Sequence, residues 1–320
     1  MRAWVRRWAS GRRARRWVAA FCLFVLTALA VDYFAYPYGS LLGGRSSNRG
    51  ENGLWLRYTW YFSQYSRVEV VELGQRLARE QVRYAYFHVR SVLVDGRLKY
   101  RHAESADFNR RLHEADPKIC SIAWVYVDGS VDLSNETVRR QMAEEASWLV
   151  HTCGFDGVQW DYEPCHSGDA GLLRLLEATR AALPGAFLSV ATPTWFPWPV
   201  SGAGWTEEYF GEVGKRCDQI AVMCYDTGFV TPRSYAWLVG QQAERVPRAA
   251  GKCQVLLGLP TYEAGGRSHN PRAENLKIGL KAVRESDGVA GIALFADYTT
   301  DAAEWAWYER AWLGGEGVSR

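Results

Sequence analysis

Eight short apolar runs alternate with helical patterns along most of this chain of 320 residues. Each run has the length and the apolar composition that are typical of a buried strand. Helical periodicity fills the gaps, so every strand is followed by a helix, an order that favours a parallel sheet. The expected strands are residues 54–60, 83–89, 120–127, 155–162, 187–192, 219–225, 254–259 and 289–295.

This alternation predicts an α/β fold of the closed (β/α)8 type, the TIM barrel. Eight strand–helix units over roughly 260 residues match the usual size of such a barrel. A doubly wound sheet is the alternative, but the chain lacks the glycine-rich phosphate turn that would support it. The fourth helix is expected to begin after Ser134 as its N-cap. The other helices are expected near residues 68–80, 106–115, 171–182, 206–215, 233–249, 273–286 and 302–313.

The most informative motif is residues 154–164, which read Gly-Phe-Asp-Gly-Val-Gln-Trp-Asp-Tyr-Glu-Pro. Because side chains alternate along a strand, Gln159, Asp161 and Glu163 share one face, and the opposite face is apolar. Two acidic side chains at the end of a buried strand crowd each other and lose water, which raises the pKa of at least one of them. A carboxyl group of this kind can donate a proton near neutral pH. Active sites of (β/α)8 barrels lie at this end of the strands, so we expect a catalytic site here.

The motif resembles the active-site signature of glycoside hydrolase family 18, the chitinase and endo-N-acetylglucosaminidase family, which runs Asp-Gly-x-Asp-x-Asp-x-Glu. Residues 223–226 (Met-Cys-Tyr-Asp) resemble the family's Met-x-Tyr-Asp on the sixth strand. Residues 258–262 (Gly-Leu-Pro-Thr-Tyr) resemble its Gly-x-Pro-x-Tyr on the seventh, and residues 291–295 lie where the eighth strand should end. The resemblance covers roughly residues 54–313, most of the chain, and it implies a distant member of this family.

The resemblance implies a substrate-assisted reaction, in which the acetamide group of the substrate attacks the anomeric carbon. Glu163 would protonate the leaving oxygen and then act as a base toward water. Asp161 would hold the acetamide N–H, and Tyr225 would orient the acetamide oxygen for attack. Substrate-binding roles are implied for Asp226, which would contact sugar hydroxyls or support the site, and for Tyr262 in the wall of the cleft.

Three departures from the family pattern bear on the site. Gln159 stands where the family usually has Asp; it cannot carry charge, but its amide N–H can donate to Asp161 and favour the ionised carboxylate. Phe295 stands where the family usually has Trp, the floor under the reacting sugar. The third strand reads Ser-Ile-Ala-Trp at 121–124 instead of Ser-x-Gly-Gly. The aromatic loop at 192–198 contains Trp195, which could line a sugar subsite or be structurally buried.

Three functions remain open at this stage. The first is an extracytoplasmic glycosidase that cuts β-linked glycans containing N-acetylhexosamine, with retention of configuration. The second is a non-catalytic glycan-binding barrel, which the departures at Gln159 and Phe295 make plausible. The third is a retaining glycosidase with two protein carboxylates, in which Glu263, just past the seventh strand, is the nucleophile and Glu163 the acid.

The first 16 residues carry seven arginines and no acidic residue, and an apolar run follows at 17–31. A basic flank before an apolar segment targets a chain for export and leaves its basic end in the cytoplasm. The segment at 1–36 is therefore a membrane anchor or a cleaved signal peptide, with the rest of the chain outside the cytoplasm. We expect a linker at 37–53, the barrel at 54–314 and a short tail at 315–320.

The charge distribution argues against nucleic-acid binding. The total formal charge is +3, so the seven N-terminal arginines leave a net charge of about −4 for the rest of the chain. No metal-ligand spacing and no cofactor motif occur in the sequence, so neither is expected. Six cysteines lie beyond Cys22 and would meet an oxidising environment, but their fifteen possible pairings stay open.

Overall fold

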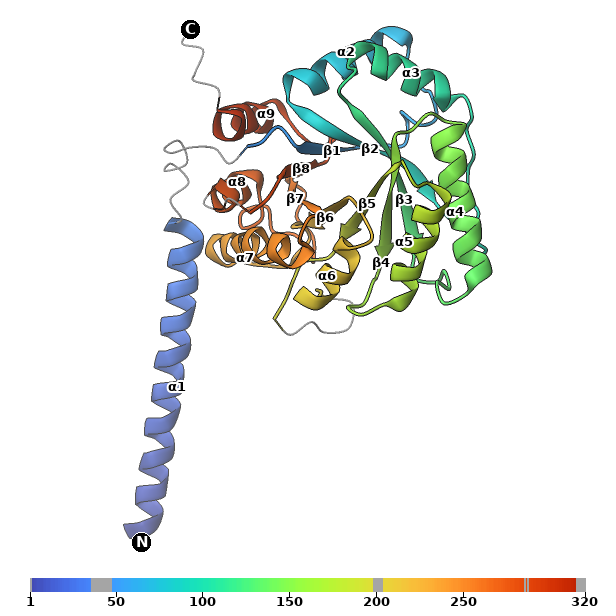
Figure 1. Ribbon diagram of the computed structural model, residues 1–320. Coiled ribbons are helices and arrows are strands. Elements are labelled where there is room, and N and C mark those ends of the chain that lie inside the picture. The colour runs from blue at the N-terminus through green and yellow to red at the C-terminus, as the bar shows by residue number, and fades with distance from the viewer. Residues whose placement is uncertain (1, 36–47, 198–203, 285, 287, 315–320) are drawn as a thin grey trace, which may run out of the picture.

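The computed structural model describes residues 2–35, 48–197, 204–284, 286 and 288–314. Within them, eight parallel strands close into a barrel in the order β1 to β8, which confirms the predicted fold class. Helices surround the strands, as Figure 1 shows. The strands are β1 (Asn52–Leu56), β2 (Val82–Ser91), β3 (Cys120–Asp128), β4 (Gly157–Glu163), β5 (Phe187–Thr192), β6 (Gln219–Met223), β7 (Gln254–Pro260) and β8 (Gly291–Phe295).

The helices of the barrel follow their strands in the same order. The last of them continues directly into a π-helical turn, η2 (Glu309–Leu313). They are α2 (Arg67–Arg79), α3 (Ser105–Ala115), α4 (Glu136–His151), α5 (Ala170–Ala182), α6 (Glu207–Gly214), α7 (Pro232–Ala250), α8 (Leu276–Arg284) and α9 (Ala302–Tyr308).

The largest error in an expected strand end is at β1, and the expected N-cap of α4 was also wrong. Strand β1 ends at Leu56 rather than at residue 60, because the chain turns directly afterwards over residues 58–63. Helix α4 is capped by Asn135 and not by Ser134, since the Asn135 side chain accepts the backbone N–H of Thr137. The hydroxyl of Ser134 instead donates to Asp132 in the preceding turn.

The motif at 154–164 forms β4 as expected, with one face in the barrel and one under the helices. Val158 and Trp160 belong to the apolar layer between strands and helices, and the Trp160 indole N–H donates to Thr179 on α5. Gly157 is required by packing, because a Cβ there would lie 1.9 Å from the carbonyl oxygen of Phe187 on β5. The strand is therefore pressed against β5 at its start, and its carboxylates emerge at the opposite end.

Helix α1 (Arg2–Ala35) extends away from the barrel (Figure 1). Its segment Ala14–Asp32 is 19 residues long, with a mean hydropathy of 1.7, and is long and apolar enough to cross a membrane. Most of the expected linker, residues 36–47, and the expected tail at 315–320 lie outside the described residues. All seven cysteines are free thiols, and two of them, Cys217 and Cys253, have sulfur atoms 3.7 Å apart.

Candidate active site

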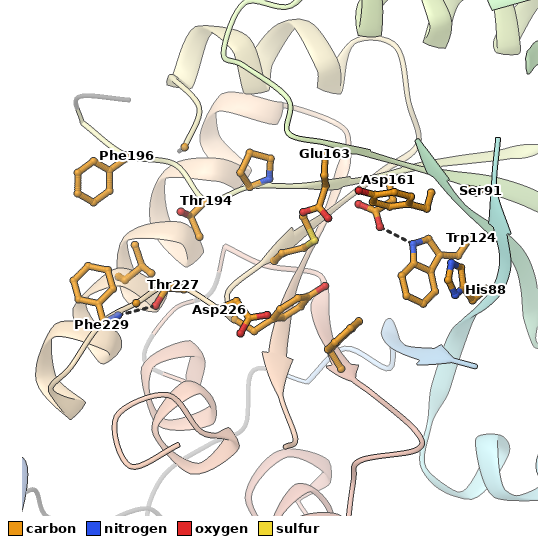
Figure 2. A pocket seen from close by; sticks show the side chains of 18 of the residues that line it. His88, Ser91, Trp124, Asp161, Glu163, Thr194, Phe196, Asp226, Thr227 and Phe229 are labelled. Atoms are coloured by element: carbon orange, nitrogen blue, oxygen red, sulfur yellow. Dashed lines mark hydrogen bonds between the residues drawn. The ribbon is translucent and has the colours of Figure 1, made fainter. Parts of the chain in front are cut away.

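A cavity of about 860 Å³ opens at the carboxyl ends of the strands, and Figure 2 shows the side chains around it. Most of its wall is aromatic or apolar, and three carboxyl groups and one guanidinium project among these side chains. The lining residues come from β2, β3, β4, β6 and β8, from the loops that follow β5 and β6, and, for Leu238, from α7: His88, Arg90, Ser91, Trp124, Tyr126, Asp161, Glu163, Pro193, Thr194, Phe196, Gly204, Met223, Tyr225, Asp226, Thr227, Gly228, Phe229, Leu238 and Phe295.

Asp161, near the end of β4, is almost completely buried, with 4% of its surface exposed. Trp124 on β3 donates an indole N–H hydrogen bond of 2.8 Å to its Oδ2 atom (Figure 2). The other carboxylate oxygen, Oδ1, is buried and has no hydrogen-bond partner among the described residues. Burial, and then the charge of Glu163, raise the pKa of Asp161 to about 8, although the indole bond lowers it. Asp161 therefore retains a proton at neutral pH.

Glu163 ends β4 and points into the cavity between the Trp124 side and the Thr194 side (Figure 2). Its side chain is exposed to solvent through the cavity. The surrounding protein nevertheless displaces part of the water around the carboxyl group, and this raises the pKa of Glu163. The carboxylate of Asp226, from the loop after β6, adds to this effect. Asp226 has a positive φ of 54°, a backbone conformation that is rare for residues other than glycine. The expected rise in pKa at this end of β4 is confirmed for both carboxyl groups.

Two stacked rings form the floor of the cavity. Tyr225 and Phe295 lie with ring centroids 4.3 Å apart and an interplanar angle of 15°. Trp55 from β1 supports both rings from below, edge to face. Burial, followed by the charges of Asp161 and Glu163, raises the pKa of the Tyr225 phenol well above its usual value, so the hydroxyl stays protonated and can donate.

Gln159 does not bond to the Asp161 carboxyl group, which corrects the expectation from the sequence. Its amide nitrogen donates to the hydroxyl of Ser189 on β5 at 3.0 Å. Its amide oxygen accepts the indole N–H of Trp55 at 2.8 Å. Gln159 lies one pleat below Asp161 and is completely buried, so its side chain reaches across the barrel rather than up to the cavity. Asp161 is consequently not held in its ionised form by this amide.

Two further residues with expected substrate contacts lie outside the cavity. Trp195 is buried, with its backbone N–H bonded to the side chain of Gln242, so the structure favours the structural role left open for it. Its neighbour Phe196 lines the cavity instead. Tyr262 does not line the cavity itself: its ring packs against His269 at a centroid distance of 4.2 Å and meets Phe295 edge to face at 6.2 Å. Residue 198 in the same aromatic loop lies outside the described residues.

Glu263, the nucleophile of the two-carboxylate alternative, is exposed and does not line the cavity. Its charge acts instead on Glu304 of α9, whose pKa is raised to about 6 by burial and, to a smaller extent, by neighbouring acids that include Glu263. The geometry of Glu263 therefore gives no support to a role opposite Glu163.

Two important lining residues were not identified as site residues from the sequence. Trp124 supplies the indole that holds Asp161, and His88 from β2 stacks on Trp124 with centroids 4.2 Å apart (Figure 2). His88 lies toward the carboxyl end of β2, and Trp124 lies midway along β3 on the same face as Tyr126; strand position and alternation are the signals that could have identified them. No cluster of three or more potential metal ligands occurs in the part of the chain that the structure describes.

No protein-family model and no curated protein sequence matches the chain. Solved structures with the same fold do match. The spore cortex-lytic enzyme SleL of Bacillus cereus has a TM-score of 0.60 and 13% identity, over 88% of this chain and 83% of that one. A chitinase from Chromobacterium violaceum has a TM-score of 0.57 and 16% identity, over 81% and 98% of the two chains.

A third structure is a family-18 chitinase variant from Cycas revoluta in complex with (GlcNAc)4. It has a TM-score of 0.57 and 14% identity, and the match covers 81% of this chain and 98% of that one. At such identities the likeness shows the fold alone. The chain thus has the barrel that these glycoside hydrolases share, as the resemblance in its motifs implied, and its activity must be argued from the site.

Proposed function

We propose that the chain is a glycosidase that hydrolyses β-linked glycans containing N-acetylhexosamine, with the substrate's own acetamide as the nucleophile. The observation that carries this proposal is the buried Oδ1 of Asp161, which has no partner among the described residues and lies at the cavity. A buried polar atom without a partner is costly, and an acetamide N–H would satisfy it. The fold that the chain shares with chitinases and a cortex-lytic enzyme supports the same class of substrate.

In the proposed reaction, Glu163 gives its proton to the glycosidic oxygen as the bond to the anomeric carbon breaks. The acetamide oxygen attacks that carbon from the opposite side and forms a cyclic oxazolinium ion. Water, deprotonated by Glu163, then opens the ion and restores both the acetamide and the original configuration. The raised pKa of Glu163 suits this role, because the acid must keep its proton near neutral pH.

Asp161 and Tyr225 would act on the acetamide group. Burial and the charge of Glu163 keep a proton on Asp161 in the free chain. The positive charge that develops on the acetamide would favour ionised Asp161, and its proton would then pass to Glu163, which donates it to the leaving oxygen. The proton of Asp161 and that of Glu163 belong to the interacting pair rather than to either residue. The Tyr225 hydroxyl would donate to the acetamide oxygen and hold it in line for attack.

The test compares a β-linked N-acetylglucosamine oligosaccharide with its de-N-acetylated counterpart, both incubated with the full chain. We expect cleavage of the acetylated substrate only, with a product of retained configuration in the first NMR spectra. Glu163→Gln should lower kcat by about 10²–10⁴, because the amide cannot donate the proton. The matched control is Glu263→Gln, which removes an exposed carboxylate outside the cavity and should leave kcat unchanged.

Equal cleavage of the de-N-acetylated substrate would exclude the acetamide mechanism and favour a protein nucleophile. Tight binding of the acetylated oligosaccharide to the wild-type chain without any cleavage would identify a glycan-binding barrel instead.

We further propose that the barrel at residues 54–314 works outside the cytoplasm and is held at the membrane by α1, or is secreted if the segment is cleaved. The seven arginines among the first 16 residues, five of them before the span of Ala14–Asp32 and two at its start, support this orientation. N-terminal sequencing of the mature chain separates the two fates. Protection of the barrel from added protease in intact cells stripped of their outer layers would contradict both.

A further inference from the structure

Arg90 is the one side chain with a permanent positive charge among the described residues that line the cavity. The other basic lining residue is His88, and burial lowers its pKa to about 4, so it is neutral under physiological conditions. No hydrogen bond or ion pair joins the Arg90 guanidinium to any described residue. A half-buried guanidinium beside an aromatic cleft therefore has its N–H donors available for a ligand.

The backbone at the end of β2 is built to direct Arg90 into the cavity. His88 pairs with Trp124, but Ser91 pairs with Tyr126, so β2 contains one residue more than β3 over this stretch. This is a β-bulge, which re-aims side chains and often occurs beside active sites. It allows the consecutive residues Arg90 and Ser91 both to line the cavity, whereas a regular strand would turn them to opposite faces.

Arg90 itself has a φ of 75°, in the left-handed region that disfavours every residue with a side chain. Glycine would adopt this conformation without steric cost. The arginine side chain therefore strains the backbone here, and strain of this kind often occurs at functional sites. The guanidinium carbon lies 4.7 Å from the ring centroid of Tyr58, in the turn after β1. This cation–π contact holds the guanidinium plane against the Tyr58 ring, and the N–H donors at the edge of that plane stay available for a ligand.

The strand register places Arg90 to one side of the reacting groups. Ser91 pairs with Tyr126, and Tyr126 pairs with Asp161, so two strand spacings, roughly 10 Å, separate Ser91 from Asp161 along the barrel edge. A ligand group at Arg90 therefore belongs to a sugar that neighbours the reacting N-acetylhexosamine.

From these observations we propose that Arg90 recognises a carboxylate on a sugar beside the cleaved bond, and that the preferred substrate is an acidic rather than a neutral N-acetylhexosamine polymer. The substrate class rests on the proposed glycosidase function. A planar guanidinium with free edge donors pairs with a carboxylate through two parallel hydrogen bonds, which a hydroxyl group cannot reproduce. The carboxylate can be part of an ether-linked lactyl group or of a uronic acid, since both present the same chemistry.

The experiment measures binding separately from turnover, by titration calorimetry on the full-length Glu163→Gln variant. Three tetrasaccharide probes are used: neutral (GlcNAc)4, alternating N-acetylglucosamine and N-acetylmuramic acid, and alternating N-acetylglucosamine and glucuronic acid. Each acidic probe is paired with its carboxyl-reduced form. We expect one of the two acidic probes to bind about 10-fold more tightly than its reduced form, and that probe identifies the source of the carboxylate.

Adding Arg90→Gly should abolish this difference, so that each acidic probe binds with the affinity of its reduced form. Glycine accepts the positive φ, so this variant is expected to fold with an unchanged or raised Tm. Arg90→Lys should retain only part of the selectivity, because an ammonium group does not pair in a bidentate manner. The matched control is Arg57→Gln, which removes a guanidinium that also lies 4.7 Å from a tyrosine ring, that of Tyr298, but does not line the cavity.

Two results would overturn the proposal: carboxyl reduction that leaves both affinities unchanged, or a preference for the acidic probe that survives Arg90→Gly. Failure of the glycosidase function gives a different result. In that case the wild-type chain cuts none of the probes, while the carboxylate preference and its dependence on Arg90 are still measured in the binding assay.

Discussion

The interior of the barrel contains two polar layers on the same strands, and they differ in how many of their hydrogen bonds are made within the protein. In the lower layer, a continuous chain of hydrogen bonds joins five strands, and only the Nε2 atom of Gln219 lacks a partner among the described residues. This chain consists of Trp55, Gln159, Ser189, Gln219 and Tyr86. In the upper layer, Asp161 has one bond, from Trp124, and its second oxygen is unpaired.

The difference follows from position along the strand. Gln159 and Asp161 are separated by one pleat on β4 and face the same interior. At the level of Gln159 the barrel is closed on all sides, so side chains from β1 and β5 complete its bonds. At the level of Asp161 the strands end and the cavity opens, so the protein leaves its groups available. Substitutions in the lower layer should therefore lower stability, whereas those in the upper layer should change activity and, where they remove a buried carboxyl group, leave stability unchanged or higher.

The largest effect is expected for Gln159→Asp. The shorter side chain loses the bonds to Trp55 and Ser189 and buries a carboxyl group in a dry layer, so unfolding should require about 3–5 kcal/mol less free energy. Denaturant titration at pH 7 measures this change. A variant of unchanged stability with a shifted pH–rate profile would show that residue 159 belongs to the upper layer after all.

Asp161→Asn should stabilise the protein at alkaline pH. The folded chain keeps the proton of Asp161 up to a pKa of about 8, whereas the unfolded chain loses it near 3.8, so wild-type stability falls as pH rises between these values. The asparagine variant lacks this loss, and its Tm should exceed that of the wild type by roughly 3–8 °C at pH 8.5. Thermal unfolding from pH 4 to pH 8.5 checks that the gap grows with pH; a constant gap would contradict the raised pKa.

Tyr225→Phe should lower kcat by roughly 5–30-fold, about 1–2 kcal/mol, through loss of one oriented hydrogen bond to the acetamide oxygen. The stack on Phe295 is retained, so Tm should change little. Tyr262→Phe is the comparison variant, because that ring packs behind Phe295 and does not itself line the cavity. A larger loss of kcat for Tyr262→Phe than for Tyr225→Phe would assign the hydrogen bond to the acetamide oxygen to Tyr262 instead of Tyr225.

The smallest effect is expected for Asp226→Asn. Removing this charge lowers the pKa of Glu163, and Glu163 must be protonated to act as the acid, so the alkaline limb of the kcat profile should move to lower pH by about one unit or less. Asp128→Asn is the control, because Asp128 pairs with Glu163 in the strand register but its exposed carboxylate bonds to Ser130. An equal shift of the alkaline limb in both variants would mean that the overall charge around the site, rather than the charge of Asp226 itself, raises the pKa of Glu163.

Much of the fold was predictable because the strand and helix periods are local. Six strand–helix units, from β2 to β7, recur at regular spacing, and their ends are close to those expected. Gln159, Asp161 and Glu163 share the interior face of β4, as the period of two along a strand requires. The turn after Leu56 was missed because the apolar pattern of β1 continues into Trp60 and Tyr61, which are buried although they lie beyond the strand.

The sequence by itself determined that a barrel forms, and that Glu163, Asp161 and Tyr225 emerge at one end of it, because alternation and strand order are properties of the chain alone. Only the tertiary structure decided the partners of these groups. Trp124 reaches Asp161, and Gln159 reaches Trp55, through contacts over 37 and 104 residues that exist only once the barrel closes. The aim of Arg90 likewise depends on a bulge between β2 and β3, which is a property of two paired strands and not of either one.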